Sequence, residues 1–592
     1  KSFAGLNFSF DIFSGTSKPI HHKLSQQFFS NLLENDFITT KSNEQFYCED
    51  CNRYLADRYV EGTCPSCKSV NARGDQCDDC GKLIETTKLI DPKCKMCGNT
   101  PIIKNTKHWF LELQKFEKAL TKWLEKKEYW KPNVINFIRN WIESGLHERA
   151  VTRDLDWGVP LPIENTEGKV LYVWLDAPIG YISATKEYSI KVGKPNLWKD
   201  YWQNDQANVV HFIGKDNIPF HTIIWPATLM GQKENWNLPE NVPANEYLNL
   251  EGKQLSTSRN WAIWVNDFLE DFDSDYLRYI LAVNAPETKD SDFSWEDFQS
   301  RINNDLNNIL GNLANRTFVF SKKRFDKIEK PKQISDNSMN IFAKVDGLIA
   351  QIEKSYKNYE VRKATKLIFD IARTGNKFFD ESKPWVSIKS DIEKAKETIW
   401  VCTELLRKIS ILAYPIIPKS MISLRKMIDL DDNIKWKDLG KQIQSAEIKD
   451  IKPLFRKIED KEVEFQLQKL KENSQTQIKD SLDVKPEIEY EDFTKLDFRV
   501  GKVLSAEKVK KSNKLLKLKV KIGHESRTVM SGIAKSYSPE EIVGMDLLLL
   551  INLKPRKIMG VLSEAMILAA ENNGKLSMLI PDAKVNSGNS VS

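Results

Sequence analysis

The chain has 592 residues, which is too many for one hydrophobic core and predicts about three to five domains. Hydrophobic residues make up 41% and charged residues 29%, and no apolar run approaches the roughly 18 residues of a membrane span, so the composition excludes a membrane role. The net charge of +6 is uneven, because 16 Lys and Arg face 8 Asp and Glu between Arg499 and Ser592. A basic region of this kind favours binding to nucleic acid, although a solvated lysine-rich face accounts for the charge equally well.

The N-terminal residues show no sign of export. The chain starts at Lys1 rather than Met, and its first residues contain no signal-peptide pattern. Eight of its nine cysteines lie within about 50 residues, which fits a metal site in a reducing compartment better than a disulfide framework. We therefore expect a cytosolic protein, and one that is a fragment of a longer chain.

The clustered cysteines form four Cys-x-x-Cys pairs, each able to point two thiolates at one ion. Two structural zinc ions are the simplest count. The short spacing favours an inner site and an outer site, while a crossed pairing stays open and redox chemistry is a less favoured alternative. The inner ligands would be Cys64, Cys67, Cys77 and Cys80, and the outer ligands Cys48, Cys51, Cys94 and Cys97. Cys402 lies in an apolar helical pattern and is expected in the core.

Two apolar runs after the cysteines predict strands of a parallel sheet with ligand groups at their ends. The first, Lys169 to Leu175, is expected to end in a turn carrying Asp176 to Gly180, and the second is "NVVHFIG". A helix should then open at Gly214, Lys215 and Asp216, an arrangement that nucleotide sites use. His221 and Trp225 would share one face of it, facing either a pocket or ordinary core.

The segments "YVWLDAPIGY" and "HFIGKDNIPFH", together with the cysteine pairs, resemble the methionyl-tRNA synthetases, which are class I aminoacyl-tRNA synthetases. The resemblance covers essentially the whole chain. It implies that six residues bind the methionine side chain, namely Trp174, Ala177, Pro178, Tyr181, His221 and Trp225. It also implies nucleotide contacts at Gly214, Lys215 and Asp216, and a role for Arg153 near the reacting phosphate.

Two features depart from the family pattern. The HIGH motif, whose histidines steady ATP, is absent, and "PIHHKL" at Pro19 to Leu24 lacks the strand and glycine that the motif needs. We expect that about one hundred family residues precede Lys1 and that the chain alone cannot form adenylate. The KMSKS loop reads QLSTS, so both lysines are replaced, although Lys253 and Arg259 could supply the charge. The expected ATP contacts in this loop are Ser256, Thr257 and Ser258.

From Asp297 the apolar spacing predicts a helix bundle of about 150 residues. Asn308, Asn312 and Arg316 recur every four residues and share one face, which by itself is more simply a solvated face. The resemblance assigns these three residues to the anticodon, together with Trp385, on which a base would stack. The anticodon read would be CAU.

Residues up to about Glu487 then predict a helix and a charged linker, and the last hundred residues predict the short strands of a small barrel. This part resembles the oligonucleotide-binding (OB) fold appended to many family members, which commonly dimerises. By the resemblance, its RNA contacts are Lys510, Lys511, Asn513, Lys514, Ser531, Lys554 and Arg556.

The expected fold class is multidomain α/β, with an incomplete Rossmann-like catalytic domain, a zinc-knuckle insertion, a helical bundle and an OB barrel. The predicted parts are 1–44 and 101–240 for the catalytic halves, 45–100 for the knuckles, 241–300 for the KMSKS-type loop and stem-contact region, 301–445 for the bundle, 446–487 for the linker and 488–592 for the barrel. The implied activity joins methionine to tRNA(Met), initiator tRNA included, with ATP and Mg²⁺. The alternative is a non-catalytic, zinc-containing tRNA-binding protein.

Overall fold

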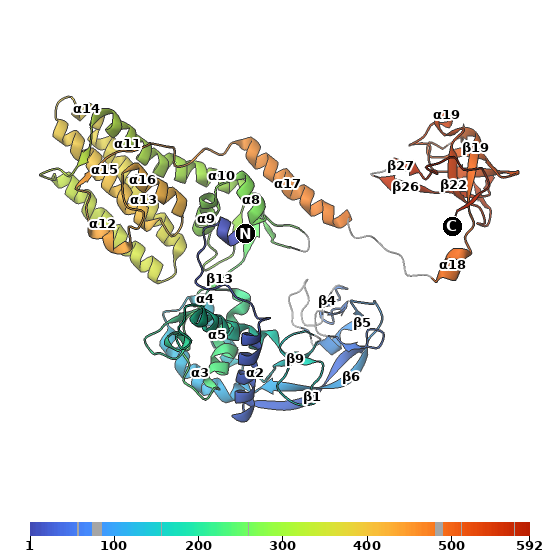
Figure 1. The fold of residues 1–592 in the computed structure, drawn as a ribbon, viewed down its shortest axis with the longest axis horizontal. Coiled ribbons are helices and arrows are strands. Elements are labelled where there is room, and N and C mark those ends of the chain that lie inside the picture. The colour runs from blue at the N-terminus through green and yellow to red at the C-terminus, as the bar shows by residue number, and fades with distance from the viewer. Residues whose placement is uncertain are drawn as a thin grey trace. The chain divides into compact units, whose positions relative to one another are not determined.

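The computed structural model describes residues 1–55, 59–70, 72–73, 84, 86–155, 157–257, 260–479, 489–510, 512–572 and 575–591. The chain divides into two compact units, Lys1–Asp480 and Ser481–Ser592 (Figure 1). Within the described residues, no helix is long and apolar enough to cross a membrane. The finer domain boundaries given above stay predictions.

The catalytic half of the first unit contains short parallel strand pairs and several helices. β10 (Val209–Val210) pairs with β12 (Pro239–Asn241), and β11 (Ile213–Gly214) pairs with β13 (Ala244–Asn245). Parallel pairing at this place is the arrangement that the sequence predicts for a nucleotide-binding sheet. The helices of this half are α2 (Pro19–Glu34), α3 (Glu117–Leu124), α4 (Pro132–Glu143), α5 (Val173–Lys191), α6 (Trp198–Trp202) and α7 (Trp225–Met230), whereas α1 (Ser2–Gly5) packs on α8 (Val265–Asp271).

The strand expected over Lys169 to Leu175 is wrong in its second half. β9 covers only Lys169–Leu171, and the helix α5 begins at Val173. β9 pairs antiparallel with β8 (Thr152–Asp154) in a sheet of two strands, so the prediction that it belongs to the parallel sheet is also wrong. The turn expected at Asp176 to Gly180 is therefore the second turn of a helix. A continuous apolar run fits a helix as well as a strand, and here its last residue, Leu175, is buried on α5, which packs on α2.

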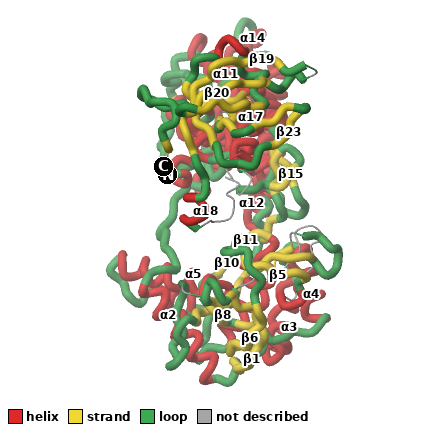
Figure 2. The backbone as a smooth tube through the Cα atoms, turned by 90° about the vertical axis from the view of Figure 1, so that its right-hand side faces the viewer, coloured by secondary structure: helices red, strands yellow, loops and turns green. Residues whose placement is uncertain are grey.

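The cysteine region is built on two small antiparallel sheets. β1 (Ile38–Cys48) and β6 (Ile102–Leu111) run side by side along nearly their whole length (Figure 2). They carry β2 (Arg53–Tyr54) and β7 (Arg149–Ala150) at the edges, and β3 (Val60–Thr63) lies between β4 (Ala72–Arg73) and β5 (Ile90–Cys94). This insertion has a small core of its own, in which Cys48, Cys64 and Cys94 are buried.

A further sheet links the catalytic half to the helices. In it, β14 (Leu248–Leu250) pairs with β15 (Lys253–Gln254) in a hairpin and with β16 (Ser291–Phe293) in parallel. The short helices α8 (Val265–Asp271) and α9 (Ser274–Val283) lie between the hairpin and β16 along the chain.

The predicted helix bundle is confirmed, with one local difference. The first long helix changes from α10 (Trp295–Arg301) to a wider π-type segment, η7 (Ile302–Gly311), before continuing as α11 (Asn312–Arg324). Side chains of Ser294, Ser335 and Asp391 cap the helices that follow them. The other helices are α12 (Asp336–Lys357), α13 (Val361–Ser382), α14 (Pro384–Ser387), α15 (Ile392–Leu412) and α16 (Pro418–Met427), with β17 (Ile328–Glu329) and β18 (Ser445–Ala446) paired beside them.

A buried ion pair fixes α15 to the chain that follows the bundle. Glu404 and Arg407 lie one turn apart with side chains 0% and 4% exposed, and they contact at 2.6 Å. Arg407 also donates to the carbonyls of Asp438 and Leu439, while Glu404 accepts from the Ile443 N–H at 3.1 Å. The two charges thus compensate each other and satisfy backbone groups that would otherwise be buried unpaired.

The last helix of the first unit, α17 (Asp460–Lys479), returns to the hairpin side. Its Asp460 accepts from Gln299 of α10 at 2.8 Å, and its Gln466 donates to Asp271 of α8 at 2.6 Å. Further along, the Asn473 carbonyl accepts from Asn260 at 3.3 Å, directly after the hairpin loop. The segment predicted as a helix and linker is therefore packed against the unit as far as these residues.

The second unit is a curled antiparallel sheet, as the sequence predicts for its strands. The order is β21 (Glu525–Ser531), β20 (Leu516–Ile522), β19 (Phe498–Lys508), β22 (Asp546–Leu550) and β25 (Met566–Ile567), with β28 (Ser590–Val591) also on β19. A Cβ at Gly501 would lie 2.6 Å from a Leu549 methyl, so glycine is needed inside this barrel. The remaining elements are α18 (Tyr490–Thr494), α19 (Pro539–Ile542), β23 (Arg556–Ile558), β24 (Val561–Ser563), β26 (Ala569–Asn572) and β27 (Lys575–Met578).

Candidate active site and RNA-binding surfaces

Three side chains from different elements form a ring cluster at the end of the parallel strands. The Tyr181 hydroxyl of α5 lies 2.9 Å from His221 Nε2, and His221 Nδ1 lies 3.0 Å from the Asn217 carbonyl. Nδ1 must therefore carry the proton, so that Nε2 accepts from Tyr181. The His211 ring lies 4.9 Å from Tyr181 and 5.2 Å from His221. Burial lowers the pKa of His221, which keeps this ring neutral at pH 7.

The helix α5 gathers most of the predicted methionine-binding residues on one face. Trp174, Ala177, Pro178 and Tyr181 are spaced i, i+3, i+4 and i+7, which aligns them along a helix. Trp174 stacks on Phe220 with ring centres 4.3 Å apart. Trp225 instead lies in a separate buried core beside Phe28 and Trp202.

His21, from the "PIHHKL" segment, contacts α5 on the side that faces α2. It is fully buried on α2, with Nε2 3.2 Å from Asp176 and Nδ1 3.1 Å from the Ser183 hydroxyl. The Ser25 hydroxyl lies 3.2 Å from the same Nε2. This histidine therefore anchors the first turns of α5, whose outer face carries Trp174 and Tyr181.

Acidification should destabilise the first unit through His211. Burial, followed by the charge of nearby His221, lowers the pKa of His211 from 6.5 to about 3. The unfolded chain binds a proton at this residue below pH 6.5 and the folded chain does not, so stability is full above 6.5 and falls toward pH 3, by about 1.4 kcal/mol per pH unit. Urea unfolding midpoints at pH 7 and 5 measure this loss. A His211→Asn variant should show a shallower pH dependence, and an unchanged dependence would contradict the assignment.

The Gly-Lys-Asp corner lies where β11 meets the short helix η5 (Lys215–Asn217). Lys215 contacts Glu246 at 2.8 Å and Asp290 at 3.0 Å; slight burial opposes its charge, but these two bonds outweigh it and raise the pKa of Lys215. Asp216 accepts from the Tyr247 hydroxyl at 2.6 Å. A Cβ on Gly214 would meet no protein atom, so the backbone there is open to a ligand.

The hairpin that carries the QLSTS loop is fixed to the same corner. Its Gly252 N–H donates to Asp292 at 2.9 Å, two residues after the Asp290 that contacts Lys215. The Lys253 ammonium lies 4.8 Å from the Trp261 ring centre, and Ser256 pairs with Trp261 across the loop. Thr257 is exposed, while Ser258 and Arg259 lie outside the described residues. The segment Asp290–Asp292 therefore contacts both the base of the hairpin loop and Lys215 of the Gly-Lys-Asp corner.

Arg153 lies on β8, just before the α5 face begins. Its guanidinium covers the Tyr172 ring at 3.8 Å and donates to the Thr152 carbonyl at 2.9 Å. Tyr172 is the residue that precedes α5. The predicted phosphate contact therefore lies at the N-terminal end of this helix, an end that favours anions.

Four cysteines of the insertion converge, and they are the predicted outer set. The sulfurs of Cys48, Cys51, Cys94 and Cys97 all lie within 4.8 Å of one another. The residue four positions after the first cysteine of each described pair, Asn52, Lys68 or Gly98, has positive φ, as a tight knuckle turn requires. Cys64 and Cys67 form such a turn, whereas Cys77 and Cys80 lie outside the described residues.

The electrostatics of the outer set suit a cation. The neighbouring thiols of Cys97 and Cys48 raise the pKa of Cys51 to about 12, because four sulfurs so close together cannot all ionise unaided. Among the residues that the structure describes, four sulfur donors gather here, and they match the donor set of a closed structural zinc site.

The predicted anticodon residues share an exposed face of the bundle. Asn308 and Asn312 are exposed, and both line a cavity of about 420 Å³ beside Ile451 to Phe455. Arg316 pairs with Asp380 and covers the Phe379 ring at 4.5 Å. Trp385 is 43% exposed, with its ring 5.9 Å from Phe379, so α13 brings Arg316 and Trp385 together.

The predicted contacts of the second unit lie on its loops and strand ends. Lys510, Asn513 and Lys514 are exposed between β19 and β20, and Ser531 pairs opposite Leu516 at the end of β21. Lys554 and Arg556 are exposed after β22. Lys511 lies outside the described residues. The exposed cations thus come from the loop between β19 and β20 and from the segment that leads from β22 into β23.

His211 and His21 were not singled out as site residues in the sequence analysis. His211 stands inside "HFIGKD", three residues before the glycine corner, and that position was the available signal. The contact between His21 and Asp176 joins residues 155 positions apart, and no local pattern predicts it.

Comparison with known proteins defines the class of this fold. A family model described as tRNA synthetases class I (M) matches residues 1–318, one described as the anticodon binding domain of methionyl tRNA ligase matches 328–474, and one described as a putative tRNA binding domain matches 498–590. The fold and the site therefore define a class I aminoacyl-tRNA synthetase.

Within this class, the named relatives share one amino-acid specificity, which is methionine. The methionine–tRNA ligases of Bacteroides fragilis (strain YCH46) and Flavobacterium psychrophilum are each 44% identical to this chain, over all of it and 88% of their own length. The structure of Mycobacterium tuberculosis methionyl-tRNA synthetase with methionyl-adenylate shares the fold with a TM-score of 0.62, at 23% identity over 77% of this chain and 84% of that one. The chain belongs to the methionyl-tRNA synthetase family.

Proposed function

We propose that the protein is a methionine–tRNA ligase that activates methionine with ATP and transfers it to tRNA(Met), initiator tRNA included. The observation that carries this proposal is the ring cluster of Tyr181, His211 and His221 beside the Gly214 corner, within a chain of this family. Aromatic and neutral imidazole surfaces suit a thioether side chain, and an open backbone corner suits a nucleotide. A non-catalytic tRNA-binding role has no comparable support.

The chemistry assigned to the chain's own residues is positioning and charge stabilisation. The methionine carboxylate would attack the α-phosphate of ATP, and pyrophosphate would leave. Lys215, Lys253 and Arg153 would stabilise charge on the phosphates, with Arg259 as a further cation from the same loop as Lys253. Mg²⁺ bound with ATP would neutralise further phosphate charge. No side chain is proposed as a nucleophile.

The test is methionine-dependent exchange of pyrophosphate into ATP, measured on the full-length gene product. A Tyr181→Phe variant should raise the KM for methionine about tenfold with a smaller effect on the KM for ATP, because His221 Nε2 would lose its only described partner. Tyr201→Phe, at an exposed tyrosine of α6, is the matched control. Equal methionine KM values in the variant and the wild type would contradict the assignment of the pocket.

Zinc is the metal proposed for the outer cysteine set, Cys48, Cys51, Cys94 and Cys97. Its role would be structural, because four thiolates leave no open position for water. We propose a second structural zinc ion for the inner set of Cys64, Cys67, Cys77 and Cys80, as the spacing indicates. The clustered thiols also support our proposal that the protein works in a reducing cytoplasm.

The tRNA would be held at two places, the anticodon on the bundle and the stem or elbow on the second unit. Phosphate contacts make such binding fall steeply with salt. A Lys554→Ala variant is expected to weaken tRNA binding and to reduce the slope of log K against log salt by about 1. Lys584→Ala, on the same unit, is the control. Filter binding between 50 and 200 mM salt decides the matter, and an unchanged slope would exclude Lys554 as a phosphate contact.

A homodimer through the second unit is also proposed. Several apolar side chains of this unit are exposed, which supports an interface between copies. They are Met559, Leu562, Met566, Leu579 and Ile580. Light scattering should give twice the chain mass, and the mass of a single chain at micromolar concentration would refute the dimer.

A further inference from the structure

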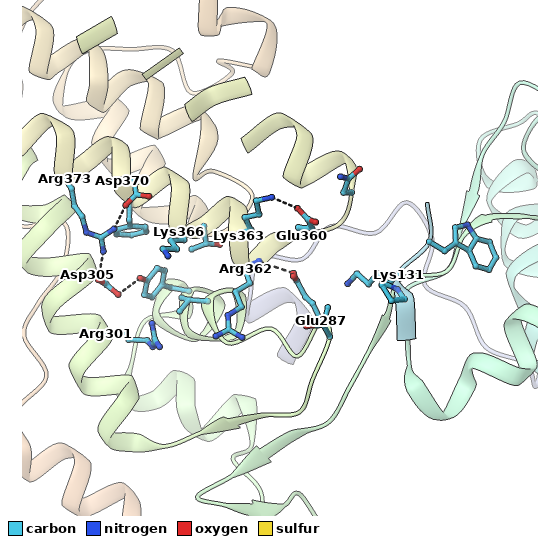
Figure 3. A pocket seen from close by; sticks show the side chains of 18 of the residues that line it. Lys131, Glu287, Arg301, Asp305, Glu360, Arg362, Lys363, Lys366, Asp370 and Arg373 are labelled. Carbon is cyan, nitrogen blue, oxygen red and sulfur yellow. Dashed lines mark hydrogen bonds and ion pairs between the residues drawn. The ribbon is translucent and has the colours of Figure 1, made fainter. Parts of the chain in front are cut away.

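A cavity of about 980 Å³ lies between the catalytic half and the helix bundle of the first unit. On one side it is lined by the segment Tyr129–Pro132, and on the other by α13, α9 and the start of η7 (Figure 3). None of the residues assigned above to methionine, ATP, metal or anticodon lines it. The volume falls at the upper end of the range found for small-molecule sites.

Basic side chains outnumber acidic ones around this cavity, six to four. The basic residues are Lys131, Arg301, Arg362, Lys363, Lys366 and Arg373, and the acidic residues are Glu287, Asp305, Glu360 and Asp370. Most of them pair locally: Arg373 contacts Asp305 at 3.3 Å and Asp370 at 2.9 Å, and Lys363 contacts Glu360 at 3.3 Å. Arg301 is held by Asp297 at 2.8 Å.

Three of the cations have no carboxylate within ion-pair distance in the described part of the chain: Lys131, Arg362 and Lys366. Arg362 and Lys366 are one helical turn apart on α13, and Figure 3 shows Lys131 on the opposite side of the cavity. Glu287 accepts from the backbone N–H of Arg362 at 3.0 Å rather than from its guanidinium. Burial lowers the pKa of Lys131, and the carboxylates of Glu287 and Glu360 offset only part of this effect.

Aromatic side chains form a rigid wall beside these cations. The rings of Tyr279 and Phe369 are both buried and lie 5.1 Å apart. The Tyr279 hydroxyl donates to Asp305 at 2.9 Å, and Asp305 is in turn held by Arg373. The aromatic edge can contact a planar ring, and the neighbouring unpaired cations can bind an anion. A ligand that carries both groups would therefore find a partner for each.

We propose that this cavity binds a free nucleotide, separate from the ATP used in catalysis, with its phosphates between Lys131 on one side and Arg362 and Lys366 on the other. Cations on opposite walls of a partly open cavity suit a short polyanion better than a continuous RNA backbone, which follows an extended surface. A ligand there would bridge the catalytic half and the bundle and would restrict their relative motion.

The test uses GTP as the probe, because ATP also enters the active site. Equilibrium dialysis of radiolabelled GTP is run on the full-length protein, with methionine and a non-hydrolysable ATP analogue present in saturating amounts. We expect one GTP per chain, displaced by inorganic tripolyphosphate. Arg362→Glu and Lys366→Glu should each weaken binding about tenfold or more. Lys377→Glu, also on α13 but outside the cavity lining and paired with Glu381 at 3.6 Å, should bind GTP as the wild type does.

Several results would overturn the proposal: no GTP binding, GTP binding that appears only when methionine and the ATP analogue are left out, or wild-type GTP affinity in Lys366→Glu. If only tRNA binding responds to these substitutions, the cations belong to an RNA surface and the nucleotide site is refuted. Arg362 and Lys366 are exposed, so urea unfolding midpoints should match the wild type; Lys366→Ala provides a milder variant where they do not.

Discussion

A Cys94→Ser variant should lose one zinc ion per chain and loosen the sheet of β3, β4 and β5. Cys94 is fully buried at the end of β5, and its sulfur lies 3.9 Å from that of Cys51. Structural zinc contributes roughly 10–16 kcal/mol in isolated knuckles at pH 7, and removal of one of four ligands forfeits much of it. Zinc per chain, measured by mass spectrometry after dialysis against a chelator, gives the result.

The double variant Cys48→Ser/Cys94→Ser separates the possible pairings. If both residues bind the same ion, as the 4.8 Å cluster indicates, the double variant loses one zinc and not two. A crossed pairing would cost two. Cys402→Ala, at the buried cysteine of α15, serves as the control and should keep its full zinc content. A wild-type zinc count in Cys94→Ser would contradict the site.

Glu404→Gln should destabilise the helix bundle by about 3–5 kcal/mol, because it leaves the Arg407 charge buried without a counterion. The glutamine amide fills the same space as the carboxylate. The loss of stability therefore measures the removal of the negative charge and not the opening of a cavity. Urea unfolding followed by circular dichroism at 222 nm gives the change in midpoint.

An exposed pair on the same bundle provides the comparison. Glu353 and Lys357 of α12 are one turn apart at 2.7 Å, with side chains 44% and 72% exposed. Glu353→Gln should change stability by at most about 0.5 kcal/mol. Similar losses in Glu404→Gln and Glu353→Gln would show that burial does not govern the strength of these pairs.

Local patterns predicted those parts of the fold in which one signal dominates. The helices of the bundle and the strands of the second unit were predicted from the spacing of apolar residues close together in the chain. The structure contains both the bundle and these strands. The second half of the Lys169 to Leu175 run failed because Pro178 and Gly180 suggested a turn, whereas both lie within α5. The i, i+3, i+4, i+7 spacing from Trp174 to Tyr181 was the signal for a helix, and the apolar run masked it.

The candidate site was predictable where a motif is contiguous and not where it depends on packing. Gly214 to Asp216 do form a corner between a strand and a helix. Their partners Glu246 and Asp290 come from distant segments, and only the fold brings them to Lys215. Trp225 shows the same limit. Its spacing from His221 is that of one α-helix face, yet His221 lies in the wide turn η6 (Phe220–Ile224) and the Trp225 ring joins another core.

The way α17 returns to the hairpin side bears on how this protein can be rearranged in evolution. Because Gln466 and Asn473 are bonded to Asp271 and Asn260, the residues after the bundle brace the region of the QLSTS loop. A gene fusion that exchanges the C-terminal unit therefore preserves the ATP loop only if the crossover falls after α17. We expect residues 1–479 to behave as the indivisible module and the C-terminal unit as the interchangeable one.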